Sequence, residues 1–195
     1  MNQQKSVGAM KLNKLKFENH EVILGIVLVV LGASARLLPH PANFVPLGAI
    51  AIFSGLFLPR KLALWLPIVA LFISDLLIGF YSWPIMATVY ASFLLTTFVA
   101  TKISHKFAPI LGTTLAGAIF FFLTTNAAVW AFGTMYTHNF AGLIQSYTMA
   151  LPFFRNSLMG DLFFTAILVG SYFAAMALIK KHNVIPTNTG ISVES

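Results

Sequence analysis

Six apolar runs, separated by short stretches rich in polar residues, proline or glycine, determine what this chain can fold into. The runs cover approximately residues 22–38, 45–58, 62–80, 85–101, 109–135 and 157–179. A helix needs about 20 apolar residues to cross a bilayer, and most of the runs approach that length. Only 9% of the 195 residues are charged, whereas soluble domains carry about 25%. We therefore predict an all-α integral membrane protein, built as a bundle of six transmembrane helices.

Polar segments at both ends flank this membrane domain. We assign residues 1–19 to a basic cytoplasmic segment, residues 20–181 to the six-helix membrane domain and residues 182–195 to a flexible cytoplasmic tail. The first apolar run also has features of a signal peptide, because an A-x-A cleavage site, Ala33-Ser34-Ala35, follows a basic leader. Retention of this run as the first span and cleavage after Ala35 are both open alternatives.

Lysine and arginine are distributed unequally between alternate loops. If the N-terminus is inside, the outer segments contain only Arg36 and Arg155, and the inner segments contain the other ten of the 12 Lys and Arg residues. Short loops rich in Lys and Arg stay on the cytoplasmic side of a membrane. The asymmetry predicts a multi-pass protein with both termini in the cytoplasm. It also explains the net charge of +7 without nucleic acid, so we expect no nucleic-acid partner.

Polar side chains gather at the outer end of this predicted bundle. An unpaired charge in lipid is unfavourable, so Arg155 and Asp161 should face protein, a water-filled pocket or a ligand. A few polar groups on an apolar lining are typical of small-molecule sites. We expect a surface loop over residues 136–156 to cover such a site. The polar candidates are Arg36, Asn43, Asp75, Asn126, Arg155, Asn156 and Asp161, and the aromatic candidates are Tyr81, Trp83 and Trp130.

A purely structural role for the charged residues is an open alternative. Asp75 and Asp161 would then pair with Arg36 and Arg155 or cap helices, and the pairs would lock the bundle. Residues six apart on a continuous helix differ by about 240° net, so Arg155 and Asp161 do not share a face. Either Arg155 lies in the loop and folds back, or each of the two residues has a separate partner, with Arg36 and Asp75 as the nearest candidates.

Recognised catalytic motifs do not occur in this sequence. It contains no H-E-x-x-H, no G-x-x-x-x-G-K-[ST] and no G-x-S-x-G. Gly160-Asp161 matches half of the G-x-G-D signature of intramembrane aspartyl proteases, but Leu158 stands where the first glycine belongs. The chain has no cysteine, which excludes disulfides and thiolate metal sites. We expect a protein that is not an enzyme and that carries no metal and no cofactor.

Three segments together resemble a bacterial family of uncharacterised transport proteins. They are Leu37–Ala49 (LLPHPANFVPLGA), Ser74-Asp75-Leu76, and Leu151–Thr165 (LPFFRNSLMGDLFFT). That family is similar in size and six-helix layout to the substrate-binding S components of energy-coupling factor (ECF) vitamin transporters. It is also similar to BtuM-like proteins, which bind cobalamin. The resemblance implies a location in the bacterial inner membrane, a vitamin-like substrate with cobalamin among the candidates, and an energising transporter module as a candidate partner.

Two positions depart from the patterns of these relatives. BtuM-like proteins are associated with a cysteine that ligates cobalt, and this chain has none. S components tend to carry A-x-x-x-A on the first helix, whereas here Val29 stands four residues before Ala33. Our leading hypothesis is a membrane-embedded substrate-binding component of a micronutrient uptake transporter. The alternative is a membrane scaffold or assembly factor without a transport role, in which the charged residues form structural ion pairs.

Overall fold

The computed structural model describes residues 23–183, and every regular element in that range is a helix. The predicted segment 1–19 and all but the first two residues of the predicted tail lie outside the described residues. The helices are Ile23–Leu37, α2 (Leu47–Phe57), α3 (Arg60–Ile78), α4 (Trp83–Ala100), α5 (Phe107–Phe132) and α6 (Phe140–Asn183). The prediction of an all-α fold with six helices is confirmed, but Ile23–Leu37 and α2 are shorter than the membrane spans that the sequence predicted.

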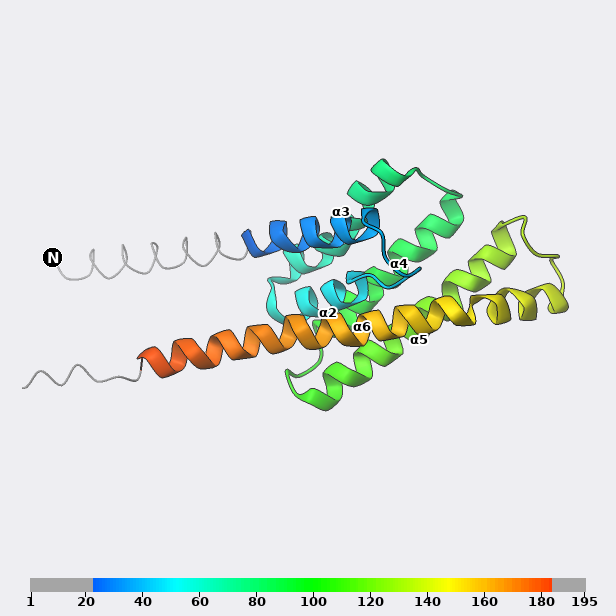
Figure 1. The fold of residues 1–195 in the computed structure, drawn as a ribbon. Coiled ribbons are helices and arrows are strands. Elements are labelled where there is room, and N and C mark those ends of the chain that lie inside the picture. Colours follow the sequence, from blue (N-terminus) through cyan, green and yellow to red (C-terminus); the bar gives the residue numbers. More distant parts are fainter. Residues whose placement is uncertain (1–22, 184–195) are drawn as a thin grey trace, which may run out of the picture.

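Successive helices run back and forth along the bundle (Figure 1). The described chain begins and ends at the same end, where the α2–α3 and α4–α5 connections also lie. We call this the inner end, following the predicted orientation. The opposite, outer end carries the connections 38–46, 79–82 and 133–139.

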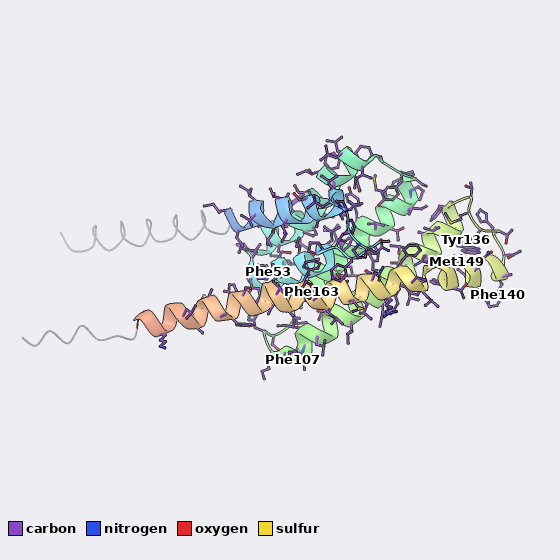
Figure 2. The ribbon with its side chains drawn as sticks, viewed as in Figure 1. Phe53, Phe107, Tyr136, Phe140, Met149 and Phe163 are labelled. Atoms are coloured by element: carbon purple, nitrogen blue, oxygen red, sulfur yellow. The ribbon has the colours of Figure 1, made fainter. Side chains whose placement is uncertain are left out.

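The surface of the bundle is apolar as well as its interior. Four helices, α3 to α6, are long and apolar enough to cross a membrane. Side chains project outward from them (Figure 2), and Phe107 and Phe140 are 79% and 76% exposed. Soluble proteins rarely expose large contiguous apolar patches. The apolar helices and their apolar exterior therefore indicate a membrane protein.

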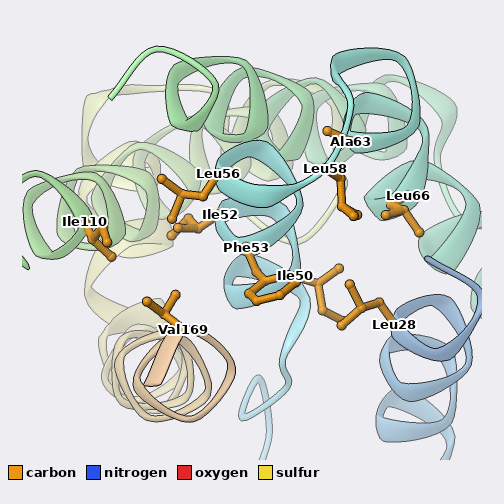
Figure 3. Packing of buried hydrophobic residues seen from close by; sticks show 10 residues of the cluster. All are labelled: Leu28, Ile50, Ile52, Phe53, Leu56, Leu58, Ala63, Leu66, Ile110 and Val169. Carbon is orange, nitrogen blue, oxygen red and sulfur yellow. The ribbon is translucent and has the colours of Figure 1, made fainter. Parts of the chain in front are cut away.

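The short helix α2 lies at the centre of the bundle. Ten of its 11 residues are buried, and it contacts α3, α4, α5 and α6. A helix that is apolar on all sides is stable only when it is surrounded by other apolar elements. Eleven residues span about 16 Å, which is too short to cross a bilayer core of about 30 Å. Figure 3 shows Ile50, Phe53 and Leu56 of α2 in the hydrophobic core, together with Leu28 and Val169 from the first helix and α6.

A glycine allows α2 to pack closely against α4. A Cβ atom on Gly55 would lie only 2.6 Å from the Cβ of Ala100 and 2.6 Å from the carbonyl oxygen of Thr97. Any larger residue would push the two helices apart. The small side chains of α2 thus determine how tightly the bundle closes around it.

The last helix is much longer than the sequence predicted. Instead of a loop over residues 136–156, the structure has helix from Phe140 onward, and only Gly133–Asn139 connect it to α5. The predicted surface loop is therefore wrong. Asn139 is the N-cap, since its Oδ1 accepts a hydrogen bond of 2.9 Å from the backbone N–H of Gly142. A helix of 44 residues is about 66 Å long, so α6 extends beyond the thickness of a bilayer core.

Candidate functional site

Two of the three segments that carry the family resemblance pack against each other at the outer end. The connection that leads into α2 lies along one face of α6. Asn156 Nδ2 donates a hydrogen bond of 3.0 Å to the carbonyl oxygen of Ala42. One turn further along α6, a Cβ on Gly160 would lie 3.4 Å from the Cα of Phe44, so glycine permits close contact here. This part of α6 therefore supports the connection that precedes α2.

Asp161 directly follows Gly160 on α6 and lies against the first turn of α2. It is only 9% exposed. Its carboxylate is so close to Gly48 that a Cβ on residue 48 would lie 2.6 Å from Asp161 Cγ. α2 has no side-chain cap and no acidic residue in its first turn, and the N–H groups of a first turn lack partners within the helix. The Asp161 carboxylate thus complements the positive end of the α2 dipole from a neighbouring helix.

The third segment forms an ion pair between the first helix and α3. Arg36 Nη1 lies 2.6 Å from Asp75 Oδ1 and donates a second hydrogen bond of 2.5 Å to Ser74 Oγ. The hydroxyl of Tyr90 in α4 donates to the other carboxylate oxygen, Asp75 Oδ2, at 2.9 Å. The Asp75 side chain is 1% exposed and that of Arg36 is 20% exposed. This network joins three helices, as the structural alternative for Arg36 and Asp75 predicted.

A cavity of about 190 Å³ lies between these two sets of contacts. Its walls come from the first helix, from α2 to α6 and from two outer connections, and they are largely apolar. The polar or ionisable residues on its lining are Arg36, Asn43, Tyr81, Thr96, Thr114, Ser157 and Asp161. Burial raises the pKa of Tyr81 to about 12, the Asp75 carboxylate adds to this effect and Arg36 opposes it. Tyr81 is therefore a neutral phenol at physiological pH.

Asn43, which lies beside the cavity, has an unusual backbone conformation. Its φ angle is 64°, a left-handed value that asparagine tolerates better than most residues. The turn around it is closed by a hydrogen bond of 2.9 Å from the N–H of Phe44 to the carbonyl oxygen of Pro41. Asn43 lines both this cavity and a smaller one of about 130 Å³. The smaller cavity also contains Asn126, whose Nδ2 donates to Phe122 O at 2.7 Å.

The predicted site residues fall into three groups in the structure. Arg36, Asn43, Tyr81 and Asp161 line the cavity of about 190 Å³, and Asn126 lines the smaller one. Asp75 and Asn156 do not line either cavity. Asp75 holds Arg36, which lines the larger of the two, and Asn156 holds Ala42, the neighbour of Asn43. The remaining three, Trp83, Trp130 and Arg155, lie elsewhere.

The three residues of the third group lie on the surface or in the α5–α6 connection region. Trp83, at the start of α4, is 72% exposed. Trp130 Nε1 donates to the carbonyl oxygens of Thr137, at 3.0 Å, and Asn139, at 3.2 Å, so it fixes the α5–α6 connection. Arg155 is exposed on α6, whereas Asp161 is buried. This difference agrees with the prediction that the two do not share a face of one helix.

Three hydroxyl residues on the cavity lining were not among the sequence candidates. Thr96 Oγ1 donates to Ser92 O and Thr114 Oγ1 donates to Ile110 O, both at 2.9 Å within their own helices. Such hydroxyls retain lone pairs that accept hydrogen bonds from a ligand. Ser157 precedes Asp161 by four residues, so the two share a face of α6. That spacing was visible in the sequence and identifies Ser157 once Asp161 is selected.

Comparison with known proteins places the chain in a family. Residues 16–185 match a family model whose description is "Family of unknown function (DUF6580)". No curated protein and no solved structure matches the sequence. The matched range includes every described helix, so the cavity and its lining belong to the part of the chain that the family defines.

Proposed function

The chain belongs to the DUF6580 family of unknown function, and we propose that it is the membrane-embedded substrate-binding component of a micronutrient uptake transporter. The observation that carries this proposal is the cavity of about 190 Å³ beneath the outer connections. Asn43 and Tyr81 come from those connections, so a ligand arriving from outside reaches them first. Apolar walls with a few polar groups are typical of small-molecule binding sites.

The volume of the cavity limits the size of the substrate. An engineered protein cavity of about 150 Å³ holds a benzene molecule. A cavity of about 190 Å³ therefore suits a molecule with one ring and a short substituent. Cobalamin, with its corrin macrocycle and nucleotide loop, is several times larger. We accordingly propose a small vitamin-like nutrient.

The proposed role is binding rather than catalysis. The proposed location is the inner membrane of a bacterium, and both termini of the chain would lie in the cytoplasm. The ten-to-two distribution of Lys and Arg supports this orientation. An energising transporter module is a proposed partner on the strength of the resemblance to ECF S components. Nucleic acid is not a proposed partner.

Deletion of the gene, combined with a matched pair of variants, tests the proposal. Ala118 on α5 lines the cavity and is 3% exposed, whereas Ala116, two residues away, is exposed outside it. We expect the deletion strain to grow poorly when one nutrient is scarce and to recover when it is in excess. Wild type and Ala116→Leu should restore growth, but Ala118→Leu, which fills the cavity, should not. Normal uptake of every candidate nutrient by the deletion strain would contradict the proposal.

A membrane scaffold or assembly factor is the second candidate function. It is favoured by two observations: Arg36 and Asp75 form a complete ion pair, and the Asp161 carboxylate lies at the N-terminus of α2 without any ligand. Under this hypothesis Ala118→Leu restores the deletion strain as well as Ala116→Leu does, provided that both proteins reach the membrane in normal amounts. Excess nutrient then has no effect on the deletion phenotype.

A further inference from the structure

The ionisable groups on the cavity lining do not balance in charge. Arg36 is neutralised by Asp75 at 2.6 Å, and Tyr81 is a neutral phenol. Asp161 lines the cavity, and among the side chains that the structure describes it forms no ion pair with a lysine, arginine or histidine. The cavity therefore presents one carboxylate without a cationic partner.

The α2 N-terminus compensates this carboxylate only in part. A helix N-terminus is equivalent to about half of one positive charge. Asp161 is 9% exposed, and a buried carboxyl group is neutral unless a counter-charge and hydrogen-bond donors stabilise its ionised form. A bound ammonium group would supply both.

The rest of the lining is suited to a cation that donates hydrogen bonds. Ser157, one turn before Asp161, adds a hydroxyl oxygen to the same face of α6. The rings of Phe93 and Phe121 lie 5.0 Å apart, and both residues line the cavity. Aromatic faces attract ammonium groups, and hydroxyl and carboxylate oxygens accept their N–H bonds.

We propose that the cavity binds a small organic cation, a protonated amine attached to an apolar body of about one ring, with the ammonium group on Asp161. This inference rests on the proposed function and names the class of its substrate. The carboxylate selects the positive charge, and the apolar walls contact the ring.

Three probes of one shape and different charge test this inference. Benzylamine is a cation at neutral pH, benzyl alcohol is neutral and benzoate is an anion. Their binding to the full-length protein in detergent micelles is measured by calorimetry and by the thermal unfolding midpoint, at constant KCl concentration. We expect benzylamine to bind at least tenfold more tightly than benzoate, with benzyl alcohol between them. Asp161→Asn, which keeps the shape of the side chain, should abolish the preference for benzylamine.

Lys61→Gln provides the control, because it also removes one charge but lies at the inner end in an exposed position. It should leave the order of the three probes unchanged. If Asp161→Asn does not fold, the order of the three binding affinities measured on wild type alone tests the inference.

Three outcomes would overturn the inference. They are equal or tighter binding of benzyl alcohol or benzoate, no detectable binding of benzylamine, and protection by KCl or NaCl alone that equals protection by benzylamine. None of them bears on the growth phenotype of the deletion strain. A nutrient-dependent phenotype combined with a failed probe series would keep the transport proposal and discard the organic cation, whereas a phenotype without nutrient dependence would discard the transport proposal.

Discussion

The carboxylate of Asp161 on α6 occupies the space that a side chain on Gly48 of α2 would need. This contact joins the longest helix to the shortest and most buried one. It also places Asp161, the one carboxylate that residues 23–183 contribute to the cavity lining, at the positive end of α2. The same contact therefore helps to hold α2 in place and puts a carboxylate on the cavity lining.

Gly48→Ala should destabilise the protein. The new Cβ would lie 2.6 Å from Asp161 Cγ, and overpacking of this kind costs about 1–3 kcal/mol. Reversible unfolding in one detergent should show a lower midpoint for this variant. Gly112→Ala in α5 is the matched control, because no atom lies within 4 Å of its added Cβ. Equal stability of the two variants would show that Asp161 does not lie against Gly48.

A double-mutant cycle on Arg36 and Asp75 should reveal strong coupling. Loss of one partner of a fully buried pair costs about 3–5 kcal/mol, and we expect somewhat less here because Arg36 is 20% exposed. The Arg36→Ala and Asp75→Ala double variant should be more stable than the sum of the single effects predicts. Arg36→Lys should recover only part of the loss, since one guanidinium group contacts both Ser74 and Asp75. If the losses of stability in the two single variants simply add up in the double variant, the ion pair between Arg36 and Asp75 is contradicted.

Arg155→Ala should change little. Arg155 is exposed on α6 and does not line either cavity, and surface substitutions of this kind usually alter stability by less than about 0.5 kcal/mol. Unfolding and benzylamine titration, on the variant and on wild type, check this expectation. If the variant has normal stability but no longer binds benzylamine, Arg155 belongs to the ligand site, as the sequence analysis predicted. A marked loss of stability would instead reveal a structural partner.

The apolar runs predicted six helices, but they did not predict where the last one begins. Residues 140–156 combine apolar and polar side chains in a way that suits both a surface loop and a helix that extends beyond the bilayer. The deciding signal was Asn139, an N-cap residue immediately before Phe140. A search for cap residues would have predicted the longer helix.

Only some of the residues on the cavity lining could be selected from the sequence, and the reason is physical. In a membrane bundle both the core and the lipid-facing surface are apolar, so hydropathy does not show which face of a helix points inward. Arg36 and Asp161 could be selected because charge is costly in lipid. Trp83 and Trp130 could not be placed in this way, because an aromatic ring is stable in the core, at the surface or in a loop.

Reporter fusions should confirm the orientation of the helices. Fusions at residues 106 and 181 are expected to report the cytoplasm, and a fusion near residue 145 is expected to report the outside. The reason is the excess of Lys and Arg in the segments assigned to the inner side. A fusion at residue 181 that reports the outside would refute an arrangement of the six helices with both termini inside.

Native mass spectrometry of the protein purified from its own membrane tests the central claim most directly. We predict that wild type and Ala116→Leu retain a small molecule of about one-ring size that is released on unfolding. Ala118→Leu, which fills the cavity, should retain none. Absence of any small molecule from wild type, or equal retention by Ala118→Leu, would contradict the claim that this cavity is a binding site.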